Sequence, residues 1–235
     1  MGGNRLRGEA LLAAAASPLP PPVEDLVPDP ALLDGVPADL PRLLSLLPGA
    51  DLYLQDEVEV ALHPPLTRAW CRRGRRGQRL VETPGTNRKR HGFGLVDGRD
   101  GWLDWSMEAG RRAAPFCAQL RRALARSTAR GRTALVLLDN LSIHTPRGSK
   151  LLRTLLAQAG DRLVLVYPPR YDPEANRIAW LWRALRRTVT HNHQRVALEP
   201  LLADADRWAA GLSAAAVLSQ IGSPGTPEQD LADAA

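Results

Sequence analysis

An unbroken apolar run, Ala134 to Leu138, ends in the polar pair Asp139-Asn140. A run of this length is typical of a central strand that helices cover on both faces. It therefore predicts a layered α/β domain. No apolar stretch reaches the roughly 18 residues that a transmembrane helix needs, and two cysteines cannot make a disulfide framework. We therefore expect no membrane contact and a cytoplasmic location.

Hydrophobic periodicity and turn residues predict the elements around this run. Strands are expected at 52–60, 90–96, 102–107, 134–138 and 163–167, and helices at 115–126, 149–159, 174–187 and 198–211. This order, with three antiparallel strands ahead of alternating helices and strands, predicts an α/β arrangement. The Ala- and Pro-rich residues 1–36 predict a flexible leader, residues 37–214 the folded domain, and residues 215–235 a disordered acidic tail.

Positive charge is concentrated between residues 68 and 99. That stretch holds ten basic residues against Glu82 and Asp97, a net charge of +8. Such a concentration indicates a polyanionic partner, most often nucleic acid. The candidate phosphate contacts are Arg72, Arg73, Arg75, Arg76, Arg88, Lys89 and Arg90. The alternative is a solvated loop in a chain where arginine is the common base.

Two carboxylates stand out by their position in predicted strands. Asp56 alternates with Leu54 and Val58 on an apolar face, while Glu57 and Glu59 are expected to face solvent. A buried carboxylate is costly unless it is paired or metal-bound. Asp139 follows the apolar strand, at the edge where α/β sheets bind ligands. The alternatives are an ion pair with an arginine for Asp56 and a turn cap for Asp139.

Four sequence blocks together resemble the DDE domain of mariner-like insertion-sequence transposases, over roughly residues 37–212. They are Leu54-Gln55-Asp56-Glu57, Leu137-Leu138-Asp139-Asn140 with Ser142 to Pro146, Tyr167 to Asn176, and Trp180-Leu181-Trp182. The resemblance implies a ribonuclease-H-like (integrase-like) fold, a mixed five-stranded sheet flanked by helices. It also implies Mg²⁺- or Mn²⁺-dependent cutting and joining of transposon-end DNA, with that DNA held by the basic 68–99 stretch.

The resemblance assigns metal binding and catalysis to Asp56, which would bridge two ions, and to Asp139, which would bind one. Glu57, Asn140, His144 and Asn176 would line the site.

The chain departs from the family pattern at Ala179, which stands where the third carboxylate is expected. Glu174 lies about 140° around a helix from that position, and Asp172 about 10 Å away along it. Neither is a convincing substitute. We therefore expect weak metal binding and impaired catalysis.

A second departure concerns the helix-turn-helix modules that precede the catalytic domain in the family. The residues ahead of Asp56 are Pro-rich and acidic, and no compact basic module is found among them. We interpret the chain as a truncated frame or as half of a split transposase. It would act as a homodimer or with a helix-turn-helix-bearing partner chain. The alternatives are a non-catalytic DNA-binding remnant and an unrelated ribonuclease-H-like nuclease.

Overall fold

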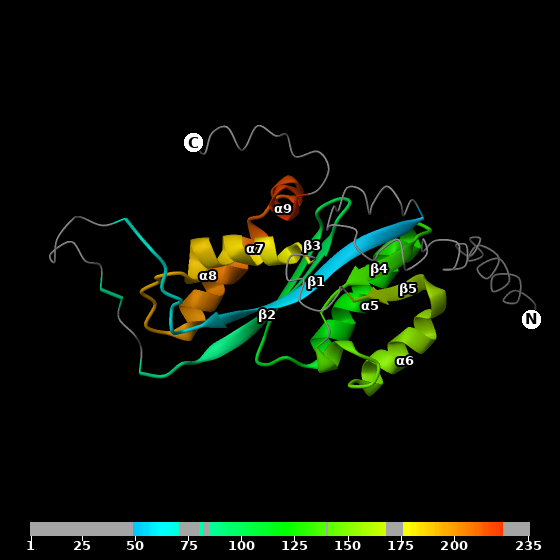
Figure 1. The fold of residues 1–235 in the computed structure, drawn as a ribbon, viewed down its shortest axis with the longest axis horizontal. Coiled ribbons are helices and arrows are strands. Elements are labelled where there is room, and N and C mark those ends of the chain that lie inside the picture. The colour runs from blue at the N-terminus through cyan, green and yellow to red at the C-terminus, as the bar shows by residue number, and fades with distance from the viewer. Residues whose placement is uncertain (1–48, 71–79, 82–84, 140, 168–175, 223–235) are drawn as a thin grey trace, which may run out of the picture.

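A five-stranded mixed sheet forms the centre of the molecule (Figure 1). The structure, a computed structural model, describes residues 49–70, 80–81, 85–139, 141–167 and 176–222. Its strands are β1 (Ala50–Ala61), β2 (Lys89–Asp97), β3 (Leu103–Glu108), β4 (Thr133–Leu137) and β5 (Leu163–Val166), in the order β3-β2-β1-β4-β5. The β1–β2 and β2–β3 pairs are antiparallel, and the β1–β4 and β4–β5 pairs are parallel. The predicted mixed five-stranded sheet is confirmed.

Helices cover both faces of the sheet (Figure 1). The helical elements are α5 (Ala113–Ala129), the 3-10 turns η2 (Ser142–His144) and η3 (Gly160–Arg162), α6 (Lys150–Ala159), α7 (Ile178–Leu185), the π-helical turn η4 (Arg186–Thr190), α8 (Leu198–Ala210) and α9 (Ala214–Ile221). Helices α5 and α6 cover one face, where Phe116, Leu120 and Ala123 of α5 repeat at helical spacing. Helices α7, α8 and α9 lie on the other face. None of the helices in these described ranges is long and apolar enough to cross a membrane.

Strand β1 is buried on both faces, which corrects the expectation that its glutamates face solvent. Leu54 and Val58 pack in the core under α7. On the opposite face, Tyr53 lies in the core under α5, and Glu57 is only 7% exposed. Glu59 alone is exposed, as predicted. The alternation was correct, but the second helical layer buries the face that alternation alone assigned to water.

Two element boundaries differ from the prediction. The helix expected from residue 174 begins at Ile178 among the described residues and continues beyond Leu185 as the π-helical turn η4. The tail expected to be disordered from residue 215 begins with α9, whose Val217 and Ile221 are buried in the core beside α7. The ordered domain therefore extends to at least Gly222. The leader 1–36 and residues 223–235 lie outside the described residues.

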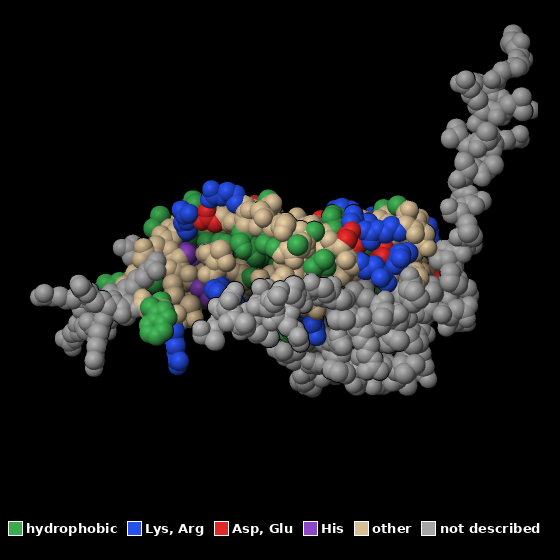
Figure 2. All heavy atoms as spheres, turned by 90° about the horizontal axis from the view of Figure 1, so that it is seen from above, with side chains coloured by type: hydrophobic (Ala, Val, Ile, Leu, Met, Phe, Trp, Pro, Cys, Tyr) green, Lys and Arg blue, Asp and Glu red, His purple; other side chains and the backbone are tan. Residues whose placement is uncertain are grey.

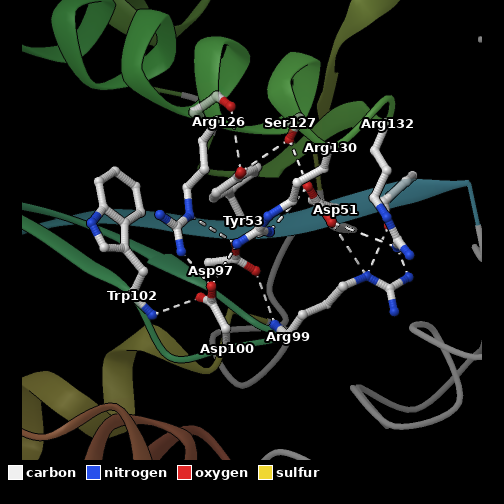
Figure 3. A network of polar contacts seen from close by, with 12 residues as sticks. Asp51, Tyr53, Asp97, Arg99, Asp100, Trp102, Arg126, Ser127, Arg130 and Arg132 are labelled. Carbon is white, nitrogen blue, oxygen red and sulfur yellow. Dashed lines mark hydrogen bonds and ion pairs between the residues drawn. The ribbon is translucent and has the colours of Figure 1, made fainter.

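Buried acids and arginines tie the start of β1 to the end of α5 (Figure 3). Asp51 and Asp97 are fully buried, and Arg130 contacts both, at 3.2 Å and 2.7 Å. The Tyr53 hydroxyl lies 3.0 Å from Ser127 Oγ, which donates to Asp51 at 3.0 Å. This network ties the N-terminal end of β1 to the C-terminal end of α5.

Candidate active site

The register of the sheet brings Asp56 and Asp139 together. Strands β1 and β4 run parallel, with Leu54 paired to Leu137 as the last pair, so Asp56 lies two residues beyond this pair in β1 and Asp139 two residues past the end of β4. Burial, together with the charges of Glu57 and Asp139, raises the pKa of Asp56 to about 6, against the lowering effect of a hydrogen bond from the Glu57 amide. Asp139 therefore lies close enough for its charge to act on Asp56.

His144 joins this acid pair to a third carboxylate. Its Nδ1 lies 2.6 Å from Asp139 Oδ1, and its Nε2 lies 2.8 Å from Glu57 Oε1. Burial alone would lower the pKa of His144, but hydrogen bonds to the two carboxylates, together with their charges, outweigh burial and raise it to about 9. The ring is therefore an imidazolium at neutral pH that donates a hydrogen bond to each acid.

The surroundings hold the His144 ring in place. The ring is fully buried and lies 4.4 Å from that of Phe116, measured between ring centroids. The Tyr167 hydroxyl donates to the His144 carbonyl at 2.7 Å, and Gln55 Nε2 donates to Glu57 at 3.1 Å. Sequence reasoning assigned no role to Phe116, Tyr167 or Gln55. Residues two apart in a strand share a face, and this was the one sequence signal that Gln55 could contact Glu57.

Helix α7 crosses the sheet directly beside Asp56. Asn176, just before the helix, donates from Nδ2 to the Gln55 carbonyl at 2.8 Å. Asp56 pairs with Gly94 of β2, and a Cβ on Gly94 would lie 2.2 Å from the Trp182 ring. The absence of a side chain at Gly94 thus lets α7 approach closely. Ala179 lies in the first turn of this helix and is partly buried.

The donor set fits one divalent cation better than two. Asp56 and Asp139 offer carboxylate oxygens, the ligands that Mg²⁺ and Mn²⁺ prefer. Across the described ranges, no three His, Cys, Asp or Glu side chains are placed to hold a metal ion. The imidazolium of His144 already neutralises Glu57. Asn140, Asp172 and Glu174 lie outside the described residues.

Three of the candidate phosphate-binding residues, Arg88, Lys89 and Arg90, are among the described residues, and they lie at the start of β2, opposite the end of β1. Arg88 precedes β2, and Lys89 and Arg90 begin it, with Arg90 paired to Val60. Four residues of strand separate that pair from Asp56, about 13 Å. Arg88 and Lys89 also form exposed ion pairs with Glu199 and Glu59. Arg72, Arg73, Arg75 and Arg76 lie outside the described residues.

One cation that sequence reasoning missed acts on the acids. Arg111 is exposed in the turn before α5, outside the 68–99 stretch. Its positive charge is among the contributions that lower the pKa of Asp139, after the larger effect of the hydrogen bond from His144. No sequence signal distinguished Arg111 from the many other arginines.

Comparison with solved structures identifies the fold. The Mos1 transposase paired-end complex with left transposon end superimposes with a TM-score of 0.55 at 16% identity, over 78% of this chain and 55% of that one. The Mos1 mariner paired end complex with Mn gives a TM-score of 0.55 at 14% identity, over 94% of this chain and 75% of that one. The fold is therefore the ribonuclease-H-like fold of these proteins.

The sequence matches carry the assignment further. A family model described as DDE superfamily endonuclease matches residues 51–199. The insertion element IS630 uncharacterized 39 kDa protein of Shigella sonnei is 30% identical over 151 residues, which cover 64% of this chain and 42% of that protein. The chain thus spans less than half the length of this curated relative. It belongs to the DDE superfamily endonucleases.

Proposed function

We propose that this chain is a transposase-type endonuclease domain that binds transposon-end DNA, with Asp56 and Asp139 as its surviving catalytic acids. The observation that supports the proposal is the parallel pairing of β1 with β4, which ends at Leu54 and Leu137, together with the charge of Asp139 acting on Asp56. Their environment raises the pKa of Asp56, as expected where acids are crowded for a cation. The Mos1 paired-end complex with left transposon end and the Mos1 paired end complex with Mn support DNA and a divalent ion as partners.

In this proposal each side chain has a separate task. Asp56 and Asp139 would hold the divalent ion, which when bound supplies charge neutralisation and alignment at a phosphodiester. His144 orients Asp139 through the 2.6 Å contact, and Asn176 holds the start of α7 against the strand that carries Asp56. Arg111 contributes positive charge near Asp139, where a phosphate would approach.

Ala179 is the reason to propose impaired catalysis. An alanine offers no oxygen to a metal, and the two remaining carboxylates suit a single ion. The second candidate function, a non-catalytic DNA-binding protein of the same descent, rests on this residue as well. In that case the basic 68–99 stretch would retain the DNA while the acid pair remains inactive.

A nicking assay on supercoiled plasmid with Mn²⁺ tests both candidates. The unmodified chain is expected to nick slowly or not at all, and Ala179→Glu to nick faster. Adding Asp139→Asn to Ala179→Glu should abolish that gain, which excludes a contaminating nuclease. Nicking by the unmodified chain that Asp172→Asn or Glu174→Gln removes would show that a displaced acid completes the site. Equal inactivity of all variants, with DNA binding intact, would favour the non-catalytic candidate.

A further inference from the structure

A cavity of about 820 Å³ lies at the end of the molecule beyond β1, away from the acid pair. Its lining includes four arginines, Arg68, Arg187, Arg195 and Arg207, with Asp204 as the single acid among the lining residues. Figure 2 shows Lys and Arg side chains gathered at two ends of one face, and one of these groups lies beside His side chains. From this lining we infer that the cavity is a binding site for phosphate groups of a nucleic-acid backbone, an inference that rests on the proposed DNA-binding function.

The arginines of the cavity fall into two pairs. Asp204 accepts a hydrogen bond from Arg195 Nε at 2.8 Å and another from Arg207, so both guanidinium groups are paired with this carboxylate. Arg68 and Arg187 are exposed, and no described residue forms an ion pair with either of them. The first pair therefore shares the charge of one carboxylate, and the second provides charge that is available to a ligand.

The backbone of the cavity is shaped by a break in helical geometry. Helix α7 widens into the π-helical turn η4, and His191 N donates to the Arg186 carbonyl at 2.7 Å. π-helical turns inside helices are frequent at functional sites. Here the turn places Arg187 in the lining. Asn192 then adopts a φ of +49°, a left-handed conformation that asparagine tolerates better than most residues.

Asn192 connects the segment after η4 to Thr67, on the opposite wall of the cavity. Its Oδ1 accepts from Thr67 N at 3.0 Å, and its Nδ2 donates to the Thr67 carbonyl at 3.1 Å. This two-bond contact imitates a strand pair and fixes the backbone next to Arg68. Arg68 is also the first residue of the basic 68–99 stretch, so the cavity is continuous with the proposed DNA-binding segment.

His193 has a structural role in this wall. Its Nδ1 accepts from Arg195 N at 3.1 Å, and its Nε2 lies 3.4 Å from the Ala61 carbonyl. Burial lowers the pKa of His193, which keeps the ring neutral with the proton on Nε2. With both nitrogens used, the histidine fixes the segment that carries Arg195. The lining therefore offers guanidinium groups, which bind phosphate oxygens through paired hydrogen bonds.

The distance to the acid pair suits one continuous DNA. Five residues of strand separate Asp56 from Ala61, about 17 Å at the usual rise per residue. Base pairs are spaced by about 3.4 Å, so this equals about five base pairs. Ala61 contacts His193 of the cavity lining, so a duplex that lies along β1 from the acids would reach the cavity within about half a helical turn. The site would hold the backbone and would not read bases.

Binding of a fluorescent random-sequence duplex, measured by anisotropy over a salt series, tests this inference. Arg187→Gln and Arg68→Gln are each expected to weaken binding and to reduce the log–log salt slope by about one unit. Arg187→Lys keeps the charge and should retain the slope. Arg121→Gln, on the exposed side of α5 in the other helical layer, is the matched control, and circular dichroism confirms that each variant is folded.

The outcomes separate this inference from the proposed function. If the unmodified chain binds DNA and Arg187→Gln behaves like Arg121→Gln, the cavity does not contact DNA and the inference is wrong, while the proposed function stands. If the unmodified chain binds no duplex at low salt, DNA binding itself fails and the inference falls with it. A slope reduced by Arg187→Gln and Arg68→Gln but not by Arg121→Gln supports the cavity as a phosphate site.

Discussion

His144 Nδ1 lies 2.6 Å from Asp139 Oδ1. Asp139 is the second residue after β4, and His144 ends the turn η2 that follows. The same oxygen accepts a hydrogen bond from Leu141 N at 3.0 Å, so one carboxylate oxygen has two donors. The other ring nitrogen of His144 reaches Glu57, the neighbour of Asp56 in β1. A single imidazolium thus connects the two strands that bear the candidate catalytic acids.

Replacing His144 by alanine is expected to lower the free energy of unfolding by about 3–5 kcal/mol. The reason is that Glu57, whose side chain is 2% exposed, would keep a buried charge without its partner. Urea unfolding measures the change. In a double-mutant cycle, adding Glu57→Gln should cost much less in the His144→Ala background than in the unmodified chain. Additive costs would show that the contact contributes little.

Ala179→Glu is expected to raise Mn²⁺ affinity by about tenfold or more, because an added carboxylate brings both charge and an oxygen ligand. Isothermal titration of the folded chain measures it. Ala179→Gln is the control, since it adds bulk and a neutral oxygen without charge. The Ala179 side chain is predicted to point toward Asp56 and Asp139. An affinity that is the same for all three forms would mean that it points elsewhere.

Gly94→Ala is expected to destabilise the domain by about 1–3 kcal/mol through overpacking. The new methyl group would lie 2.2 Å from the Trp182 ring, and the bulk of that ring cannot move away cheaply. Gly110→Ala is the matched control, because nothing lies within 4 Å of a Cβ at that position. Thermal unfolding followed by circular dichroism compares the two. Similar melting temperatures would contradict the close packing of α7 on β2.

Alkaline pH should destabilise the fold through Tyr53. Burial, followed by the charges of Asp97 and Asp51, raises the pKa of this hydroxyl to about 12, although its hydrogen bond with Ser127 lowers it. A raised pKa means that the stabilising contribution is complete below the unfolded pKa of about 10 and is lost as pH rises toward 12. Denaturant unfolding at pH 9 and 11.5 measures the loss. Tyr53→Phe should show a smaller decrease, and an equal decrease would assign the effect to other groups.

The strands of this domain could be predicted from the sequence because each has a local pattern. The apolar run before Asp139 and the alternation around Asp56 give both strands nearly their observed positions. These local patterns could not predict that Glu57 is buried. Its burial depends on α5 and on His144, which come from distant parts of the chain, and alternation alone assigns that face to water.

The positions of the helices were harder to predict where apolar residues are sparse or unevenly spaced. Helix α9 is rich in alanine, and only Val217 and Ile221 of its residues are buried. The π-helical turn η4 left no signal, because a widened turn depends on the packing around it. The cavity beside Asn192 was equally hidden, since its arginines come from three separate segments.

The sheet order has a consequence for synthesis of the chain on the ribosome. The central strand β1 is made first, but its parallel neighbour β4 follows only after β2, β3 and α5. Glu57 and His144 are 87 residues apart, and contacts over such separations form late and slowly. A nascent chain therefore carries Asp56 for some time without Asp139 beside it. The acid pair cannot exist in an unfinished polypeptide, and it assembles only as the sheet closes around β1.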